Sequence, residues 1–169
     1  MTFVVDPPRL QPQPSLTEHA VEFAPEIVAS QGIASFRRPR VAITVPLRFV
    51  GSNWLAPALA QFESMMSLRE GWDSYGGAPT SMSSVQTAIS FLGNYLAVES
   101  MPPTVVPLSD GGLQLLWHQN GLEVEATFPA TDTPEVYVRD AAANHEFDVD
   151  PTAAPSRVAL REAFQRLAV

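Results

Sequence analysis

The chain has 169 residues, a formal net charge of −8 and no cysteine, and we expect one domain with an arm. The absence of cysteine excludes disulfides, zinc–thiolate sites and thiol nucleophiles. No stretch contains the roughly 18 to 20 apolar residues that a membrane helix needs, and the N-terminus lacks the basic region of a secretory signal. We therefore expect a soluble, cytoplasmic protein that does not enter a membrane.

Residues 1–39 have the composition of a proline-rich N-terminal arm. Proline interrupts helices and central strands, and prolines fall here at positions 7, 8, 12, 14, 25 and 39. The arm is expected to be mostly extended, with helical spacing of apolar residues only between Ser15 and Ile27. Its apolar side chains need burial, either against the domain or on a partner protein. Phe23 and Phe36 are the partner contacts that we predict in this arm.

Residues 40–169 are predicted to form a single α+β domain. We expect an antiparallel β-meander of about four to five strands, packed against two to three helices. The first strand is expected over residues 41–49, where apolar side chains alternate with polar or small ones. Pro46 cannot donate a hydrogen bond to a neighbouring strand, so this strand is predicted to lie at an edge or to contain a bulge.

Two helices are predicted to follow this strand. Ser52 and Asn53 are good N-caps, and apolar residues then recur with helical spacing to about residue 68. A second helix is expected to begin at residues 81–84, where serines provide caps, and to end before Pro102.

A β-meander and a last helix complete the predicted domain. Asn120-Gly121 between two alternating segments is the strongest short-range signal of a two-residue hairpin. This turn pairs Gln119 with Leu122, which gives the hairpin one apolar core face and one mixed face. A final helix is expected over about residues 156–167. The strands of the meander are expected at residues 104–108, 113–119, 122–128, 135–139 and 145–149.

The segment Gly71–Pro79, which reads GWDSYGGAP, is the most distinctive in the chain. Its pattern continues downstream in Pro102, Pro103, Pro107, Asp110, Gly111, Gly112 and Trp117. Together these residues resemble a group of small uncharacterised bacterial proteins, over about residues 60–128 of this chain. The resemblance implies a gene on mobile or accessory DNA, and it implies no particular activity.

Two interpretations of this loop stay open. In the structural one, Asp73 accepts hydrogen bonds from the backbone of the following turn, and Gly76 and Gly77 permit positive φ angles. Trp72 and Tyr75 then anchor the loop at the edge of the core. In the functional one, Trp72, Asp73 and Tyr75 form a recognition surface for a partner protein, because aromatic side chains on a rigid loop make good interface anchors.

An enzymatic alternative would use the carboxylates near Glu70, Asp73 and His118. His118 is predicted to face Glu123 across the hairpin, and such a pair is an ordinary way to stabilise a sheet. No histidines or carboxylates have the spacing of metal ligands. We therefore predict no catalytic residue, no metal and no cofactor.

The charges of the chain bear on the kind of partner. Arg37, Arg38, Arg40 and Arg48 form a basic cluster, but the negative balance of the whole chain opposes phosphate backbones, so a nucleic acid is not an expected partner. The predicted function is a non-catalytic protein–protein interaction module, such as an antitoxin, an immunity factor or a subunit of a defence or phage assembly. Acidic residues are expected to form a solvated surface near the C-terminus: Glu135, Asp140, Glu146, Asp148 and Asp150.

Overall fold

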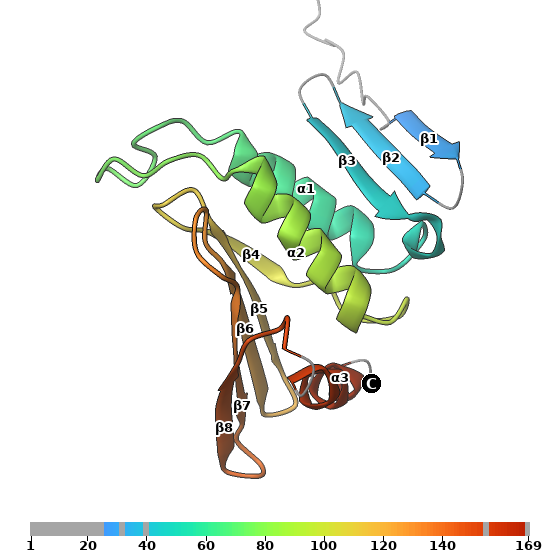
Figure 1. Ribbon diagram of the computed structural model, residues 1–169, viewed down its shortest axis with the longest axis vertical. Helices are drawn as coiled ribbons and strands as arrows, with labels where there is room; N and C mark the ends of the chain where they lie inside the picture. The colour runs from blue at the N-terminus through green and yellow to red at the C-terminus, as the bar shows by residue number, and fades with distance from the viewer. Residues whose placement is uncertain (1–25, 31–32, 39–40, 154–155, 168–169) are drawn as a thin grey trace, which may run out of the picture.

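The computed structural model describes residues 26–30, 33–38, 41–153 and 156–167. These residues form the expected α+β fold in three layers, with a pair of helices between a three-stranded and a five-stranded sheet (Figure 1). Buried apolar side chains from all three layers form one core. Within the described ranges, no helix is long and apolar enough to cross a membrane.

The small sheet is antiparallel, and its strands follow one another in chain order: β1 (Glu26–Ser30), β2 (Ile33–Arg38) and β3 (Val41–Pro46). Strand β3 lies at an edge of this sheet, as Pro46 requires. Strands β1 and β2 fall inside the segment predicted as an arm; β1 pairs with β2, and β2 pairs with β3. The rest of that segment, including the possible helix after Ser15, lies largely outside the described residues.

Strand β3 ends at Pro46 rather than at Phe49, so the predicted length of this strand was wrong. The chain turns after Pro46 into the short 3₁₀ helix η1 (Leu47–Phe49). This turn buries Phe49 in the core, with its ring centroid 5.4 Å from that of Trp54. Phe49 is apolar because this turn buries it. The alternation in the sequence therefore runs past the end of the strand.

The middle layer consists of helices α1 (Leu55–Met66) and α2 (Met82–Tyr95). Helix α2 begins as predicted, because the Ser84 backbone N–H donates to Oγ of the N-cap residue Ser81 at 3.1 Å. Its buried side chains include Val85, Ile89 and Leu92, which are the apolar stripe expected from their spacing.

The start of α1 differs from the prediction. Its N-cap residue is Trp54, and no side-chain hydrogen bond caps this end within the described residues, so the caps expected at Ser52 or Asn53 were wrong. Trp54 is fully buried, and its indole Nε1 donates to the Ala97 carbonyl oxygen at 3.0 Å. Packing of this indole against Phe49 therefore sets the start of the helix.

The large sheet is an antiparallel meander in chain order, with these strands: β4 (Thr104–Pro107), β5 (Leu113–Gln119), β6 (Leu122–Phe128), β7 (Glu135–Asp140) and β8 (His145–Val149). The predicted hairpin register is confirmed, since Gln119 pairs with Leu122 and Trp117 with Val124. Asn120 and Gly121 adopt the positive φ angles, +53° and +75°, that this two-residue turn requires.

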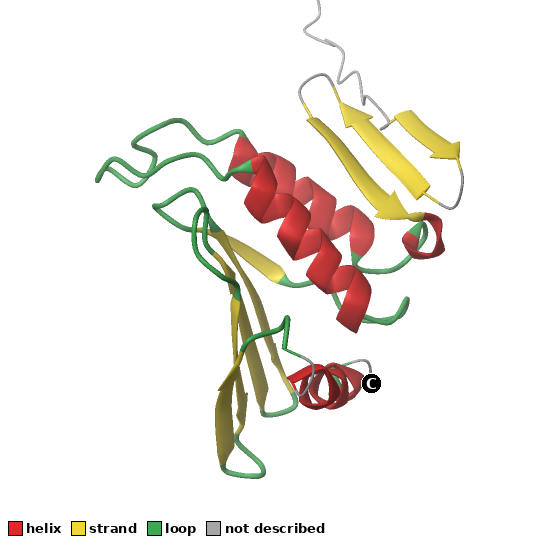
Figure 2. Ribbon diagram, viewed as in Figure 1, coloured by secondary structure: helices red, strands yellow, loops and turns green. Residues whose placement is uncertain are grey.

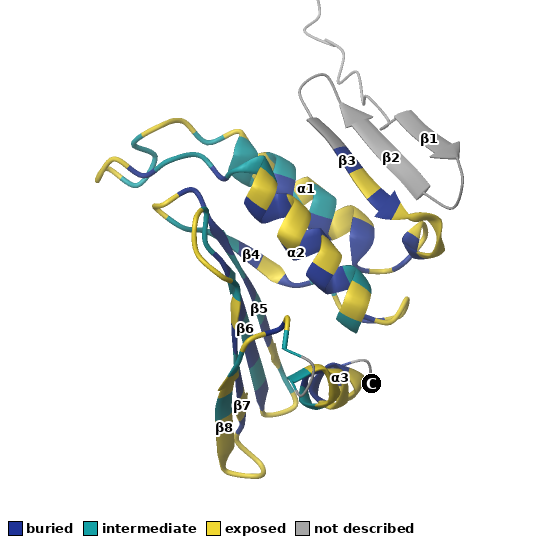
Figure 3. Cartoon of the chain, in the orientation of Figure 1, coloured by how far each residue is buried: buried dark blue, intermediate teal, exposed yellow. Residues whose placement is uncertain are grey.

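The two faces of the large sheet differ in what covers them. Helices α1, α2 and α3 (Ser156–Arg166) lie on one face, as Figures 1 and 2 show. The side chains on that face are buried, among them Leu115, Trp117 and Val124. The other face is partly or fully exposed, no described helix covers it, and Figure 3 shows the exposure along β7 and β8. This open face carries Glu123, Glu125, Glu135, Glu146 and Asp148.

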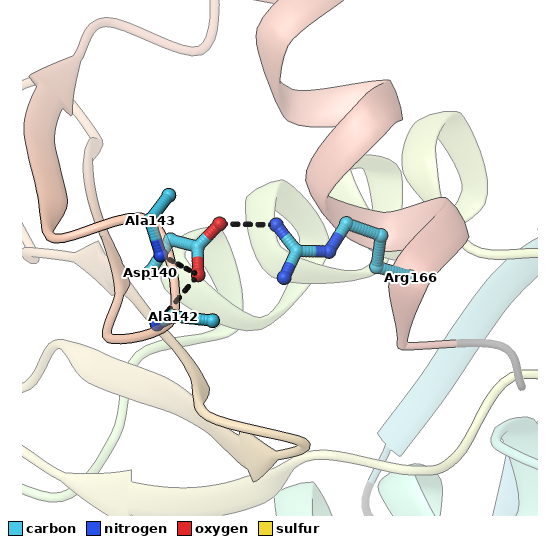
Figure 4. A network of polar contacts seen from close by, with 4 residues as sticks. All are labelled: Asp140, Ala142, Ala143 and Arg166. Atoms are coloured by element: carbon cyan, nitrogen blue, oxygen red, sulfur yellow. Dashed lines mark hydrogen bonds and ion pairs between the residues drawn. The ribbon is translucent and has the colours of Figure 1, made fainter.

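Helix α3 is held by an aromatic cluster and an ion pair. The Phe164 ring meets those of Trp117 and Phe91 edge-on, with centroids 5.0 and 5.7 Å apart. Arg166 pairs with the Asp140 carboxylate, which also accepts two backbone N–H groups of the following turn (Figure 4). Asp140 is 9% exposed, so its assignment to the solvated acidic surface was wrong.

Candidate functional site

The connection between α1 and α2 carries the GWDSYGGAP segment and extends beyond the ends of both helices (Figure 1). We call residues 69–79 the Tyr75 loop. A segment of this length without helix or strand gains order only from its own hydrogen bonds and from contacts with the body. Its backbone is held at several points.

Asp73 is the hub of the Tyr75 loop. Its Oδ1 atom accepts the backbone N–H groups of Tyr75 and Gly77, each at 2.8 Å. Its Oδ2 atom accepts the Ser109 hydroxyl at 2.6 Å. The hydrogen bond from Ser109, and then those from the two N–H groups, hold the pKa of Asp73 below its ordinary value. The predicted bonding of this carboxylate to the following turn is confirmed.

Glycine is required at two positions of this loop for different reasons. Gly76 has a φ of +90°, as predicted, which an L-residue rarely adopts. Gly77 does not use the positive φ that glycine permits. A Cβ atom on Gly77 would instead lie 2.7 Å from an Asp73 carboxylate oxygen. Gly77 therefore leaves room for the carboxylate that organises the loop.

Further hydrogen bonds close the Tyr75 loop on itself. The Gly71 N–H donates to the Gly77 carbonyl oxygen at 2.8 Å. The Trp72 indole Nε1 donates to the Ala78 carbonyl oxygen at 3.1 Å, and this side chain is only partly exposed. Trp72 thus holds the loop closed through a bond across its base, and its anchoring at the edge of the core stays a prediction.

The loop is also joined to the turn between β4 and β5. The Ala78 N–H donates to the Ser109 carbonyl oxygen at 2.9 Å, in addition to the bond from the Ser109 hydroxyl to Asp73. The next residue, Asp110, accepts the N–H groups of Gly112 at 2.8 Å and of Ala130 at 3.1 Å. Three connections far apart in the sequence therefore form one hydrogen-bonded end of the molecule.

Tyr75 does not pack on this structure. Its side chain is 95% exposed at the tip of the loop, so the prediction that it anchors the loop at the core edge was wrong. The N–H of Tyr75 is held by Asp73 while its ring points to solvent. The adjacent Ser74 has a φ of +68°, a left-handed conformation that aims the tip outward.

Comparison with protein-family models, curated protein sequences and solved structures finds no significant match to this chain. The candidate site is therefore assessed from its own geometry and chemistry.

The residues of the enzymatic alternative do not share one place. Asp73 lies beside Ser109, before β5 begins, whereas His118 lies near the far end of β5 and pairs with Glu123 on β6. A strand rises about 3.3 Å per residue, so about 20 Å of strand separates the two ends. Glu70 is exposed on the Tyr75 loop. Catalysis by these residues stays the alternative hypothesis, and the fold does not bring Asp73 and His118 together.

The described part of the chain contains no group of three or more histidine, aspartate or glutamate side chains placed to hold a metal ion. The Asp73 and Asp110 carboxylates are both taken up by N–H or O–H donors of neighbouring turns.

Of the two arm residues predicted as partner contacts, the structure describes only Phe36. Phe36 lies on β2, where its Cα pairs with that of Ile43 on β3, and Phe23 lies outside the described residues. Sequence reasoning missed Ser109, whose hydroxyl completes the Asp73 hub from 36 positions away. Ser109 directly precedes Asp110-Gly111-Gly112, which is part of the distinctive sequence pattern, and this position could have pointed to it.

Proposed function

We propose that this chain is a non-catalytic protein-binding module and that the tip of the Tyr75 loop contacts its partner. The observation that carries the proposal is a fully presented tyrosine, 95% exposed, on a loop whose backbone is held by Asp73 and Trp72. A tyrosine offers a large apolar ring and a polar hydroxyl, and such side chains are enriched among residues that dominate interface energies.

The ordered backbone of the Tyr75 loop supports a role in binding. Ordering a flexible loop on a partner costs free energy, and a loop already ordered in the free protein avoids that cost. The three backbone and side-chain bonds to Asp73 order the tip before any partner arrives. The carboxylate is fully used in this role, which favours a positioning role for Asp73 over acid–base catalysis.

The setting of the proposed partner follows from the resemblance of the GWDSYGGAP pattern to proteins of mobile or accessory DNA. We place the chain in the cytoplasm, as an antitoxin, an immunity factor or a subunit of a defence or phage assembly. The net charge of −8 favours a partner whose contact surface is neutral or basic.

Affinity capture with matched tyrosine variants tests this proposal. Tagged full-length chain, Tyr75→Ala and Tyr137→Ala are expressed in the native host, and captured proteins are quantified by mass spectrometry. Tyr137 is a suitable control because it lies on the open sheet face, away from the Tyr75 loop, and donates to Glu146 at 2.9 Å.

One protein is expected to be enriched by the unaltered chain and by Tyr137→Ala, and reduced by about tenfold or more with Tyr75→Ala. Equal recovery of that protein with Tyr75→Ala would refute a role for the loop tip. Loss with Tyr137→Ala alone would move the interface to the open sheet face.

A further inference from the structure

A pocket of about 330 Å³ lies where the C-terminal end of α2 meets the β8–α3 connection and α3. Its volume is within the range of pockets that hold small molecules. It is distant in the chain from the Tyr75 loop and shares no residue with it. The lining residues are Asn94, Tyr95, Pro151, Thr152, Arg157 and Arg161.

The pocket gathers positive charge in a negatively charged protein. Arg157 and Arg161 are four positions apart on α3, so they lie on one side of that helix. The Arg157 Nη2 atom reaches the Thr152 carbonyl oxygen at 3.4 Å. Within the described ranges, neither guanidinium forms an ion pair, whereas Arg139 and Arg166 each pair with a carboxylate. Two neighbouring like charges that have no ion-pair partner favour a bound anion.

The wall between these arginines and the core is held in place by Tyr95. Its hydroxyl donates to the Pro151 carbonyl oxygen at 2.9 Å, and its ring lies 4.7 Å from that of Phe91 between centroids. Burial raises the pKa of the Tyr95 phenol, and the charges of Arg157 and Arg161 oppose that rise. Both guanidinium charges therefore act at this wall.

Asp150 is the acidic residue that acts against an anion here, since its charge also raises the pKa of Tyr95, by less than either arginine lowers it. Its carboxylate is already occupied, because it accepts the Thr152 N–H at 2.7 Å and the Thr152 hydroxyl at 2.6 Å. Asp150 does not line the pocket. The two arginines therefore outweigh it in the space that a ligand would fill.

A second, shallower pocket continues from the first. Four lining residues are common to both, and beyond them the second pocket reaches Phe91, Phe128 and Pro134. It encloses about 150 Å³. Thr87 and Ser90 also line the second pocket, so a ligand seated on the arginines meets a mixed surface there, with apolar carbon beside two hydroxyl groups.

We propose that this pocket binds a small organic anion, with its phosphate or carboxylate group on Arg157 and Arg161 and an apolar or ring portion toward Phe91 and Pro134. The planar guanidinium fork matches the oxygen spacing of both anionic groups. The Asn94 side-chain amide lines the same pocket and supplies a further donor.

Titration of the full-length chain with simple probes tests this site. Phenyl phosphate and benzoate carry the two anionic groups on a ring, inorganic phosphate lacks the ring, and benzamide lacks the charge. Saturable one-to-one binding of phenyl phosphate or benzoate by calorimetry or NMR is expected, and which of the two binds more tightly separates a phosphate from a carboxylate ligand. Inorganic phosphate and benzamide are each expected to bind more weakly than the tighter of the two ring anions.

Matched double variants locate the binding. Arg157→Gln with Arg161→Gln is expected to weaken binding by about tenfold or more, because two charge-assisted bonds are lost. Arg48→Gln with Arg139→Gln removes the same charge at exposed positions elsewhere and is expected to leave the affinity within about twofold. If the first double variant does not fold, the two single variants are expected each to weaken binding several-fold. Absence of saturable binding by either ring anion, or equal weakening in both double variants, would overturn the proposal.

Discussion

Two aspartates in this molecule organise their turns in the same way and produce opposite results. Asp73 accepts the N–H groups of Tyr75 and Gly77, and Asp140 accepts those of Ala142 and Ala143. The difference lies in the second carboxylate oxygen of each residue. On Asp73 this oxygen accepts a neutral hydroxyl, and on Asp140 it pairs with a guanidinium.

The two turns differ in the exposure of the aromatic side chain near each of them, Tyr75 and Phe164. The hydroxyl of Ser109 ties the Tyr75 loop to another loop and leaves the Tyr75 ring in solvent. The Arg166 guanidinium belongs to α3, so the same kind of turn holds a helix whose Phe164 ring is buried. Aspartates that each accept two N–H groups of the following turn thus serve presentation in one region and closure of the core in the other.

The largest expected effect on the free energy of unfolding is at α3, the helix that Asp140 and Arg166 hold. Phe164 is 1% exposed and meets three other rings, so Phe164→Ala is expected to lower the free energy of unfolding by about 3–5 kcal/mol. Chemical denaturation with Val158→Ala as the control checks this, since Val158 lies on the same helix but is 62% exposed. A similar loss from both variants would show that α3 contributes through helix formation alone.

A smaller loss in the free energy of unfolding is expected from a change at Trp72 in the Tyr75 loop. Trp72 is partly exposed and bonds across the loop base, so Trp72→Ala is expected to cost about 2–3 kcal/mol, less than a fully buried ring. Trp72→Phe is the companion variant, because it keeps the ring and removes the bond to Ala78. An unchanged denaturation midpoint for Trp72→Ala would mean that the loop is held by Asp73 without it.

The ion pair of the closed side predicts a pH dependence. The hydrogen bond from Arg166, followed by backbone N–H groups, lowers the pKa of Asp140 from 3.8 to about 2. A folded-state pKa below the unfolded one adds stability above pH 4 or so, and this contribution disappears as the pH falls toward 2. Asp140→Asn should therefore lower the melting temperature by several degrees near neutral pH and by progressively less in acid.

Asp132→Asn removes the same charge at an exposed loop residue and serves as the control for that series. Its melting temperature is expected to follow that of the unaltered chain. A difference between Asp140→Asn and the unaltered chain that stays constant down to pH 2 would assign the loss to packing instead of ionisation.

Much of the large sheet could be predicted because its signals are local. Asn120-Gly121 defines a two-residue turn, and alternation on either side then determines which residues face the core. Ser81 likewise caps α2 with atoms three residues apart. Such features depend on neighbours in the sequence, so pattern reasoning recovers them.

The errors occur where distant contacts decide. The start of α1 depends on burial of Trp54 against Phe49 and on its bond to Ala97, 43 positions away. Exposure of Tyr75 follows from the outward turn at Ser74 and from the Ser109 bond that holds its neighbour. The spacing of aromatic residues indicated two anchors in this loop and could not tell which one would point outward.

The central claim is that the Tyr75 ring is presented for binding rather than used for folding. The dissociation constant of the captured partner, compared between Tyr75→Ala and the unaltered chain, tests it most directly. We predict a rise of about 30-fold or more, equivalent to about 2 kcal/mol, with a free energy of unfolding changed by less than about 0.5 kcal/mol. An unchanged dissociation constant, or a loss of stability as large as that of Trp72→Ala, would contradict the account.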